Sequence, residues 1–252
     1  LDSAMKQAIG IDIGGTGIKG ARVDLATGAL LSDRIKIPTP AGAHPADVFN
    51  VVETIVNRLT PTGGESIGVC FPAVVTHGRT RSASNVSNDW IDFPANEELT
   101  KALGQPIQML NDADAAGVAE ARLGAANGVA GLVILTTLGT GIGSAFLMDG
   151  VLVPNSELGL LEMDGQWAER SASNSAKERE NLSFEAWSQR LTKFYRHVED
   201  LFSPELFVIG GGISASNQDF FPLVDARTPL LPARFLNNAG IIGSALLAGE
   251  QI

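Results

Sequence analysis

The sequence predicts a mixed α/β protein built from two domains, and three observations support that class. Short apolar strands alternate with amphipathic helical segments along the chain. A strand, a glycine-rich turn and a second strand occur in that order near residues 9–23 and again near residues 132–148. No low-complexity linker separates the halves, so the boundary is expected at a tight hinge near residues 111–115. The expected domains are a small N-terminal one (1–112), a larger C-terminal one (113–238) and a helix (239–252) that packs back on the first.

The first half opens with a strand pattern. Ile9, Ile11 and Ile13 alternate as in a strand with one buried face, and the glycines that follow force a turn before a second strand at 18–23. Apolar residues spaced by three and one predict a helix over 46–59. The remaining expected elements are strands at 66–71 and 107–110 and helices at 95–103 and 114–123.

The second half repeats the strand–turn–strand design with a strand at 132–137, a turn at 138–143 and a strand at 144–148. Residues 172–181 are polar and charged, and are expected to form an exposed loop. Ser183 can cap a helix that ends at Phe202. The buried face of that helix would hold Phe184, Trp187, Leu191, Phe194 and Val198. A strand at 206–209 and a small apolar helix at 239–248 complete the expected elements.

The composition is that of an acidic, folded protein. The chain has 252 residues, with 18 Lys and Arg against 28 Asp and Glu, which gives a formal net charge of −10. Hydrophobic residues make up 44% of the chain, enough for a core and too many for a disordered protein. The acidic balance argues against nucleic acids and anionic membranes as partners, because surfaces that bind either one need a basic patch.

Composition also bounds the location and the metal chemistry. No apolar run approaches the roughly 20 residues that a membrane-spanning helix needs. Residues 1–10 lack the apolar core of a signal peptide. Cys70 is the single cysteine, so the chain can form neither an internal disulfide nor a cysteine-based zinc site. We therefore expect a cytoplasmic protein without zinc.

Three glycine clusters, each directly after a predicted strand, are candidates for phosphate binding. Glycine lets backbone N–H groups come close to an anion, and threonine adds a hydroxyl donor. Residues 123–148 contain no charged residue, so no carboxylate there would repel a phosphate. The alternative is that the glycines only form turns. The residues concerned are Gly14, Gly15, Thr16 and Gly17, then Thr137, Gly139, Thr140 and Gly141, and finally Gly210, Gly211 and Gly212.

Residues 15–20 also fit the dinucleotide pattern G-x-G-x-x-G, but two features argue against that function. The pattern requires a helix at the glycines and an acidic residue about 20 positions later. Here a strand pattern follows, and the nearest acids, Asp24 and Asp33, come too early. A Walker A motif is also absent from the sequence.

Five motifs, in order along the chain, resemble those of the sugar kinases in the actin/hexokinase-like superfamily. Residues 10–19 resemble the first phosphate signature, residues 138–143 the second, and residues 209–214 the adenosine-side segment. The Asn111-Asp112 pair and the run that starts at Glu157 resemble the sugar site of the ROK (repressor–ORF–kinase) family. A narrower resemblance, to the polyphosphate glucokinases of that family, rests on residues 68–72, 154–162 and 238–243.

The resemblance carries expectations about fold and activity. It implies the actin-like ATPase and sugar-kinase (ribonuclease H-like) fold, with two α/β domains and a cleft between them. It implies a hexokinase-type phosphotransferase that acts on the 6-hydroxyl of glucose. The donor would be inorganic polyphosphate, ATP or both, with Mg²⁺ bridging the phosphates, and a homodimer is expected.

Asp112 is the candidate catalytic residue. Phosphoryl transfer to a sugar hydroxyl needs a carboxylate that can accept the alcohol proton. Asn111 beside it can donate to and accept from sugar hydroxyls. From the local sequence alone the pair also suits a helix N-cap, and both roles are compatible at a strand-to-helix junction.

Further polar residues are candidate sugar ligands. Glu157 and Glu162 suit acceptors of sugar hydroxyls, and Glu169 is a third candidate for that role. Asn85 belongs to a polar loop close to Trp90, a combination that can grip a sugar or form an ordinary surface turn.

One position departs from the family in a way that affects specificity. The family has a histidine, which contacts the sugar near C1 and C2, where this chain has Leu160. A leucine makes no hydrogen bond to the 2-hydroxyl, so mannose is expected as a substrate beside glucose.

Charged residues near the phosphates complete the candidate site. Asp12 precedes the first glycine turn, and a carboxylate there suits a water-mediated contact with Mg²⁺ or is an ordinary turn residue. Lys19 could reach a phosphate or remain solvated. For a polyphosphate chain, Arg79 and Arg81 are better candidates than six basic residues between 170 and 196, which six acids match.

Two other function classes remain open. Some members of the family are repressors with an N-terminal DNA-binding domain, and because the first phosphate motif begins at Gly10 we expect no such domain here. A non-catalytic actin-like nucleotide-binding protein would have no need of Asn111, Asp112 and Glu157. An assay of hexose phosphate formation separates the three possibilities.

Overall fold

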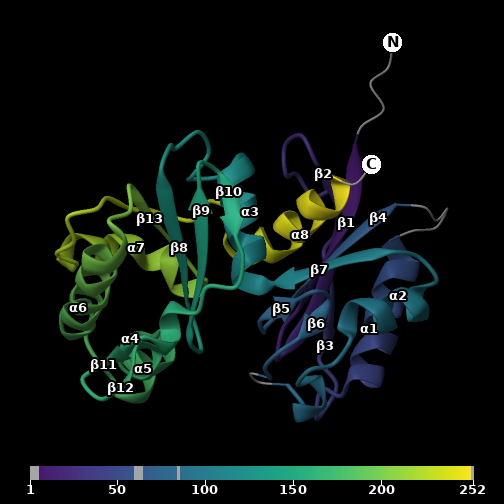
Figure 1. Ribbon diagram of the computed structural model, residues 1–252, viewed down its shortest axis with the longest axis horizontal. Coiled ribbons are helices and arrows are strands. Elements are labelled where there is room, and N and C mark those ends of the chain that lie inside the picture. Colours follow the sequence, from purple (N-terminus) through teal and green to yellow (C-terminus); the bar gives the residue numbers. More distant parts are fainter. Residues whose placement is uncertain (1–5, 60–64, 84–85, 251–252) are drawn as a thin grey trace. The chain divides into compact units, whose positions relative to one another are not determined.

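A computed structural model describes residues 6–59, 65–83 and 86–250. The chain divides into two compact units, one formed by Leu1–Ala119 with Asn238–Ile252 and the other by Glu120–Asn237. Each unit contains one five-stranded sheet (Figure 1). Across the described residues, no helix has both the length and the apolar character needed to cross a membrane.

The sheet of the first unit has the strand order β3-β2-β1-β4-β7. The predicted hairpin is present, because β1 and β2 pair antiparallel from Gln7↔Asp24 to Ile13↔Ile18. The strand β4 pairs parallel with both β1 and β7, so the carboxyl ends of these three strands share one edge of the sheet. The strands are β1 (Gln7–Ile13), β2 (Gly17–Asp24), β3 (Ile35–Pro38), β4 (Ser66–Phe71) and β7 (Ile107–Asn111).

The helix α8 (Ala239–Gly249) packs along β1 and β4 (Figure 1). Gly10 and Gly68 allow this close approach, because a Cβ on either one would lie 1.8 Å from a carbonyl oxygen of α8. The other elements of this unit are α1 (Pro45–Leu59), β5 (Val75–Thr76), β6 (Arg79–Thr80), η1 (Asn88–Trp90), α2 (Ala95–Leu103) and the start of α3 (Asp112–Leu123).

The sheet of the second unit has the order β10-β9-β8-β13-β14. Its central hairpin is again antiparallel, from Leu132↔Met148 to Leu138↔Ile142, and β13 pairs parallel with β8 and β14. The strands are β8 (Leu132–Leu138), β9 (Ile142–Met148), β10 (Val151–Val153), β13 (Leu206–Gly210) and β14 (Leu230–Pro232).

The helix α6 (Phe184–Phe202) supplies much of the core of this unit. Its predicted cap is confirmed, because Ser183 Oγ accepts from Ala186 N. Of the predicted buried face, Trp187, Leu191, Phe194 and Val198 are buried, whereas Phe184 is only partly buried. The shorter elements are η2 (Leu158–Leu160), β11 (Glu162–Met163), β12 (Gln166–Trp167), α4 (Ala168–Ala172), α5 (Asn174–Arg179), η3 (Gly212–Ser216), α7 (Asn217–Phe220), η4 (Phe221–Leu223) and η5 (Leu236–Asn238).

The exposed loop expected over residues 172–181 is wrong. The segment forms the end of α4 and all of α5, and Ala172, Ser173 and Ala176 are buried. Ser173 Oγ caps α5 by accepting from Ala176 N at 3.1 Å. The small buried residues are interspersed with charged ones, so the segment looks solvated when only its composition is considered.

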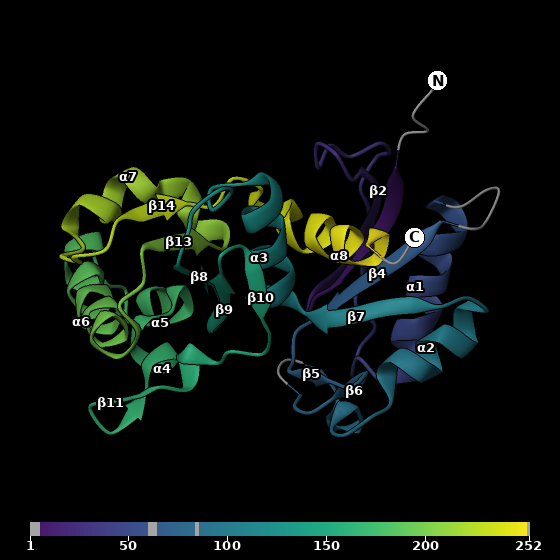
Figure 2. The ribbon, with the colours of Figure 1, turned by 45° about the horizontal axis from the view of Figure 1, so that its top comes forward.

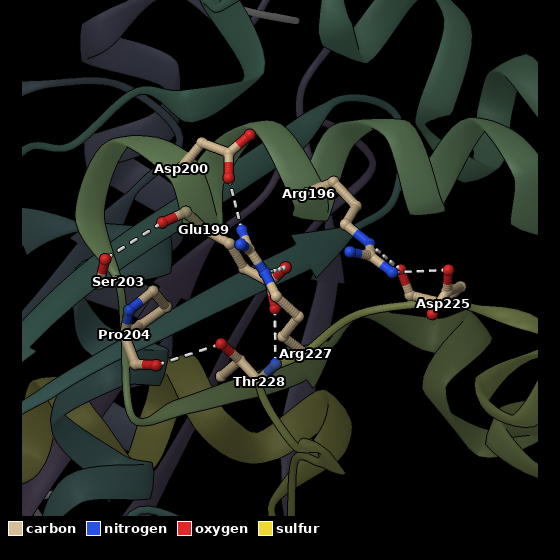
Figure 3. Close-up of polar contacts among 8 residues, drawn as sticks. All are labelled: Arg196, Glu199, Asp200, Ser203, Pro204, Asp225, Arg227 and Thr228. Atoms are coloured by element: carbon tan, nitrogen blue, oxygen red, sulfur yellow. Dashed lines mark hydrogen bonds and ion pairs between the residues drawn. The ribbon is translucent and has the colours of Figure 1, made fainter.

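Figure 3 shows how the end of α6 is fixed to the segment that leads into β14. Glu199 is only 3% exposed, and its carboxylate accepts hydrogen bonds from Thr228 N and from Arg227 Nε. Thr228 Oγ1 donates to Pro204 O at 3.1 Å. The buried charge is therefore compensated by hydrogen bonds, as a buried carboxylate requires.

The two units meet inside α3, between Ala119 and Glu120, rather than at the expected residues 112–113. The first turns of α3 pack against α8, where a Cβ on Gly243 would lie 1.7 Å from Ala115 O. The last turn belongs to the second unit, because buried Glu120 accepts from the backbone nitrogen of Phe235. The first unit also contains more residues than the second, whereas the N-terminal domain was expected to be the smaller one.

Candidate active site

The first glycine turn is braced by a segment from beyond the hairpin. Gly14 N donates to Gly17 O at 3.1 Å, which closes the turn. Thr39, which follows β3, stabilises the turn with two hydrogen bonds. Its hydroxyl donates to Gly14 O at 2.5 Å, and its backbone nitrogen donates to Thr16 O at 3.4 Å. Gly15 and Thr16 are exposed at the tip, where a ligand could reach their backbone.

Asp12, on the strand before this turn, has a partner on each carboxylate oxygen. Lys19 Nζ donates to Oδ2 at 2.9 Å, and Cys70 Sγ donates to Oδ1 at 3.6 Å. Lys19 therefore engages Asp12, an arrangement that differs from both sequence alternatives. Burial, together with the charges of Asp12 and Asp112, raises the pKa of the Cys70 thiol, which keeps it protonated as a donor.

Asn111 and Asp112 differ in burial and in their hydrogen bonds at the start of α3. Asn111 is buried, and its Oδ1 accepts from the backbone nitrogens of Ala113 and Asp114, so it caps α3. Its Nδ2 donates to Ala73 O at 3.2 Å. Asp112 is exposed at the first position of the helix, with Oδ1 accepting from Ala113 N at 2.8 Å.

The sheet register brings these residues to one edge of the first unit. Asp12 is the parallel partner of Cys70, and Phe71 is the parallel partner of Asn111. The carboxyl ends of parallel strands are the usual place for ligands in α/β sheets. This edge therefore joins two carboxylates, Asp12 and Asp112, with a glycine turn.

The second glycine turn connects β8 and β9 in the other unit. Gly139 N donates to Gly141 O at 3.1 Å, and Thr140 is exposed at the tip. Thr137, at the end of β8, is half-buried. On one flank of the turn, Ser175 N of α5 donates to Gly139 O at 3.0 Å. The helix α5 is thus attached directly to this turn.

The third glycine cluster lies against the second. Gly211 has a φ of +86°, a conformation that favours glycine. A Cβ on Gly211 would lie 2.5 Å from Leu138 O, so a larger residue would clash with the start of the turn. Gly212 begins η3 and has no atom within 4 Å of a Cβ position.

Two carboxylates lie near the other flank of the second turn. Glu169 Oε2 accepts from Ile142 N at 3.4 Å. A Cβ on Gly141 or on Gly159 would lie 2.3 or 3.1 Å from that oxygen, so the two glycines make room for it. Burial, and then the charge of Glu169, raise the pKa of the Glu157 carboxyl, so these two acids are close.

Glu162 is exposed on the β11–β12 hairpin, where it pairs with Trp167. Leu160, the last residue of η2, is 46% exposed. Asn85 and its neighbour Ser84 lie outside the described residues. In the part of the chain that the structure describes, no group of three or more His, Cys, Asp and Glu could hold a metal ion.

Sequence reasoning missed three supporting residues. Thr39 and Cys70 support the first turn and its carboxylate. Ser144 Oγ, which accepts from Leu158 N at 3.0 Å and donates to Ser156 O, fixes the segment around Glu157. Cys70 lies on β4, paired with the strand that carries Asp12, and nothing in the local sequence marks either Cys70 or Thr39.

The model of the ROK family matches residues 8–157 of the chain. The chain belongs to the ROK family. It is 44% identical to the polyphosphate glucokinase of Mycobacterium tuberculosis (strain CDC 1551 / Oshkosh), over 97% of this ROK chain and 92% of the relative.

Solved structures agree with the fold. The inorganic polyphosphate/ATP-glucomannokinase from Arthrobacter sp. strain KM is 50% identical, with a TM-score of 0.93, and the match covers 98% of this ROK chain and 99% of that one. A ROK family glucokinase from Streptomyces griseus is 23% identical with a TM-score of 0.82, over 97% and 99% of the two chains. The predicted α/β fold of the actin-like sugar kinases is therefore confirmed.

Proposed function

We propose that this ROK protein is a hexose kinase that transfers a phosphoryl group from inorganic polyphosphate or ATP to the 6-hydroxyl of glucose. One observation carries the proposal: the exposed Asp112 carboxylate shares a sheet edge with the first glycine turn, in a chain 44% identical to a polyphosphate glucokinase. The structural relative at 50% identity, a polyphosphate/ATP-glucomannokinase, supports both donors.

Asp112 acts as the base. The hydroxyl oxygen of the sugar forms a bond to the terminal phosphorus, the bond between that phosphorus and the rest of the donor breaks, and the leaving phosphate takes the electron pair. The hydroxyl proton goes to Asp112, whose orientation is fixed by Ala113 N. Asn111 holds this start of α3 in place and has a second amide hydrogen for a sugar hydroxyl.

The glycine turns bind the phosphates through backbone N–H groups, which stabilise the charge that develops in the transition state. The exposed tips at Gly15, Thr16 and Thr140 support this role. Lys19 acts mainly on Asp12, to which it is paired. The full set of proposed phosphate ligands is Gly14, Gly15, Thr16, Thr137, Gly139, Thr140, Gly141, Gly211 and Gly212.

The donor atoms near the first turn fit Mg²⁺ in a particular mode. Mg²⁺ keeps several waters and is usually bound by one or two carboxylates plus substrate phosphates. Asp12 offers a single carboxylate, already held by Lys19 and Cys70, so it suits a contact through water. When bound, the ion neutralises charge on the phosphates.

Glu157 and Glu169 are the proposed acceptors for sugar hydroxyls. Their proximity supports Glu169 rather than exposed Glu162 as the second carboxylate. Leu160 supports mannose as a second substrate, because an aliphatic side chain requires no hydrogen bond from either orientation of the 2-hydroxyl. A homodimer and a cytoplasmic location also remain proposals, to be checked by light scattering and by cell fractionation.

The deciding experiment measures hexose 6-phosphate formation with glucose or mannose and with each donor in turn. Product with glucose and at least one donor supports the kinase, and product with mannose supports the proposed effect of Leu160. A folded protein that binds ATP but forms no hexose phosphate contradicts the proposal and favours a non-catalytic nucleotide-binding protein.

A further inference from the structure

Four basic residues lie on α4, α5 and α6 of the second unit, and we name them the α4–α5 basic cluster: Arg170, Lys177, Arg179 and Arg190. Figures 1 and 2 both draw α4 beside α5, close to the β11–β12 hairpin. Arg179 Nη2 donates to Arg170 O and Arg190 Nη1 to Ser171 O, so these arginines converge on the end of α4. The Ser175–Gly139 hydrogen bond attaches α5, and with it the cluster, to the turn.

The acids close to the cluster are already engaged. Glu180 accepts from both Arg179 and Arg190, at 3.1 and 2.6 Å, so two guanidinium groups share one carboxylate. Glu178 accepts from Asn174 Nδ2 at 2.9 Å. This differs from a surface on which each cation has its own acid, as Lys193 has Asp164 and Arg196 has Asp225.

Arg170 and Lys177 lie over aromatic rings instead of carboxylates. Arg170 Cζ is 4.9 Å from the centre of the Trp167 ring, and Lys177 Nζ is 4.5 Å from the centre of the Phe184 ring. Among the described residues, neither cation has an acidic partner. A ring occupies one side of a cation and leaves N–H groups available to an anion.

The two flanks of the second turn differ in charge. The flank at Gly141 faces the carboxylate of Glu169, which repels a phosphate chain. The flank at Gly139 is bonded to α5, which carries Lys177. A polyanion that leaves this turn is therefore directed toward α5. The earlier candidates, Arg79 and Arg81, both contact Asp92, which compensates much of their charge.

We infer that the α4–α5 basic cluster binds the distal phosphates of an inorganic polyphosphate chain whose terminal phosphate lies at the second glycine turn. The inference rests on the proposed function for its donor, and it concerns binding alone. ATP, with three phosphates, has no further chain to reach the cluster. Substitutions in the cluster should therefore weaken the binding and use of long-chain polyphosphate and leave those of ATP unchanged.

The test compares two double variants that remove the same charge. Arg170→Gln with Lys177→Gln removes the two cations that lie over rings, and Lys193→Gln with Arg196→Gln removes two that are ion-paired. Calorimetry with long-chain polyphosphate at low salt should give affinity about tenfold weaker for the first variant and within about twofold of wild type for the second. The difference should shrink as ionic strength rises.

Kinetics with glucose supply the second readout. For the Arg170 and Lys177 variant, kcat/KM should fall for long-chain polyphosphate and stay within about twofold for tripolyphosphate and ATP. Equal losses in both double variants, or equal losses with ATP, would overturn the inference. A wild-type protein that binds no polyphosphate but phosphorylates glucose with ATP also overturns it and leaves the kinase standing. Formation of no hexose phosphate with any donor, with polyphosphate binding at the cluster intact, overturns the proposed function instead.

Discussion

The two sheets share one strand order, but corresponding positions around their glycine turns carry different chemistry. In the first sheet, Asp12 pairs with Lys19 on β2 and with Cys70 on β4. In the second sheet, Thr137 occupies the position two residues before the turn, and its partners are Gly143 and Gly210. An acid, a cation and a thiol in one unit thus correspond to a hydroxyl and two glycines in the other.

This difference indicates how one backbone framework can serve two purposes. Both hairpins expose a turn with backbone N–H groups at the same end of a parallel strand set. The carboxylate, ammonium and thiol groups of the first unit suit metal and proton chemistry, whereas the uncharged second hairpin suits close approach of phosphates. The packing behind the turns differs too, because α8 contacts glycines of the first sheet and α6 places aromatic residues on the second.

The largest effect is expected at Asp112. Asp112→Asn keeps the size of the side chain but removes the proposed base, so kcat should fall by about 10²- to 10⁴-fold. The matched control is Glu162→Gln, which neutralises an exposed carboxylate in the second unit and should leave kcat within about twofold. The coupled hexose phosphate assay measures both. Full turnover in a folded Asp112→Asn protein would remove Asp112 from the mechanism.

Gly10, on the strand before the first turn, and Gly139, within the second turn, should respond differently to one added methyl group. Gly10→Ala places a Cβ 1.8 Å from Ile241 O of α8, which should lower the free energy of unfolding by about 3 kcal/mol. Gly139→Ala meets no atom within 4 Å, so it should change stability by about 0.5 kcal/mol or less. Thermal unfolding measures the stability of both variants. Equal stability of Gly10→Ala and Gly139→Ala would contradict the close approach of α8.

The corresponding pair Asp12 and Thr137 tests the comparison directly. Asp12→Asn should lower kcat by about 10- to 100-fold, because it weakens the proposed water-mediated contact with Mg²⁺. Thr137→Val removes one neutral hydrogen-bonding group, which costs about fivefold at most. Titration with Mg²⁺ should require a higher concentration for Asp12→Asn alone. Similar kinetics for the two variants would mean that the charge difference between the hairpins has no catalytic meaning.

The smallest effect is a pH dependence in the second unit. Burial and Glu169 raise the pKa of Glu157, so this carboxyl takes up a proton at a higher pH than an ordinary glutamate. A protonated Glu157 is a poorer acceptor, and KM for glucose should rise about tenfold for each pH unit below that pKa. Glu157→Gln should flatten the profile, and Glu162→Gln should keep it. A flat wild-type profile would separate Glu157 from sugar binding.

Local patterns were sufficient for much of this fold. The alternating isoleucines of β1 and the capped, periodic α6 are specified by neighbouring residues, and both are found as predicted. The short edge strands β3 and β10 were missed, because three or four residues carry too little pattern. Contacts between distant residues also escaped prediction. The hydrogen bond from Phe235 to Glu120, which helps set the unit boundary, joins residues far apart in the chain.

In the candidate site, too, local motifs could be predicted and contacts between distant residues could not. The turns at the glycines and the strand-to-helix junction at Asn111-Asp112 were predictable, since each motif is contiguous, and their proposed roles stay predictions. The sequence did not decide which of the pair caps α3, because the answer depends on where Ala73 O lies. The choice between Glu162 and Glu169 likewise depends on a hydrogen bond to Ile142, from a strand that precedes both.

The ring under Arg170 gives the protein an internal optical probe. Of the three tryptophans, Trp90 and Trp187 are fully buried, whereas Trp167 is 46% exposed beneath the guanidinium group. Emission from the two buried indoles forms a constant background, while that from Trp167 responds to the charge and the water around it. Selective quenching by acrylamide would therefore follow events on this one surface in the unlabelled wild-type protein.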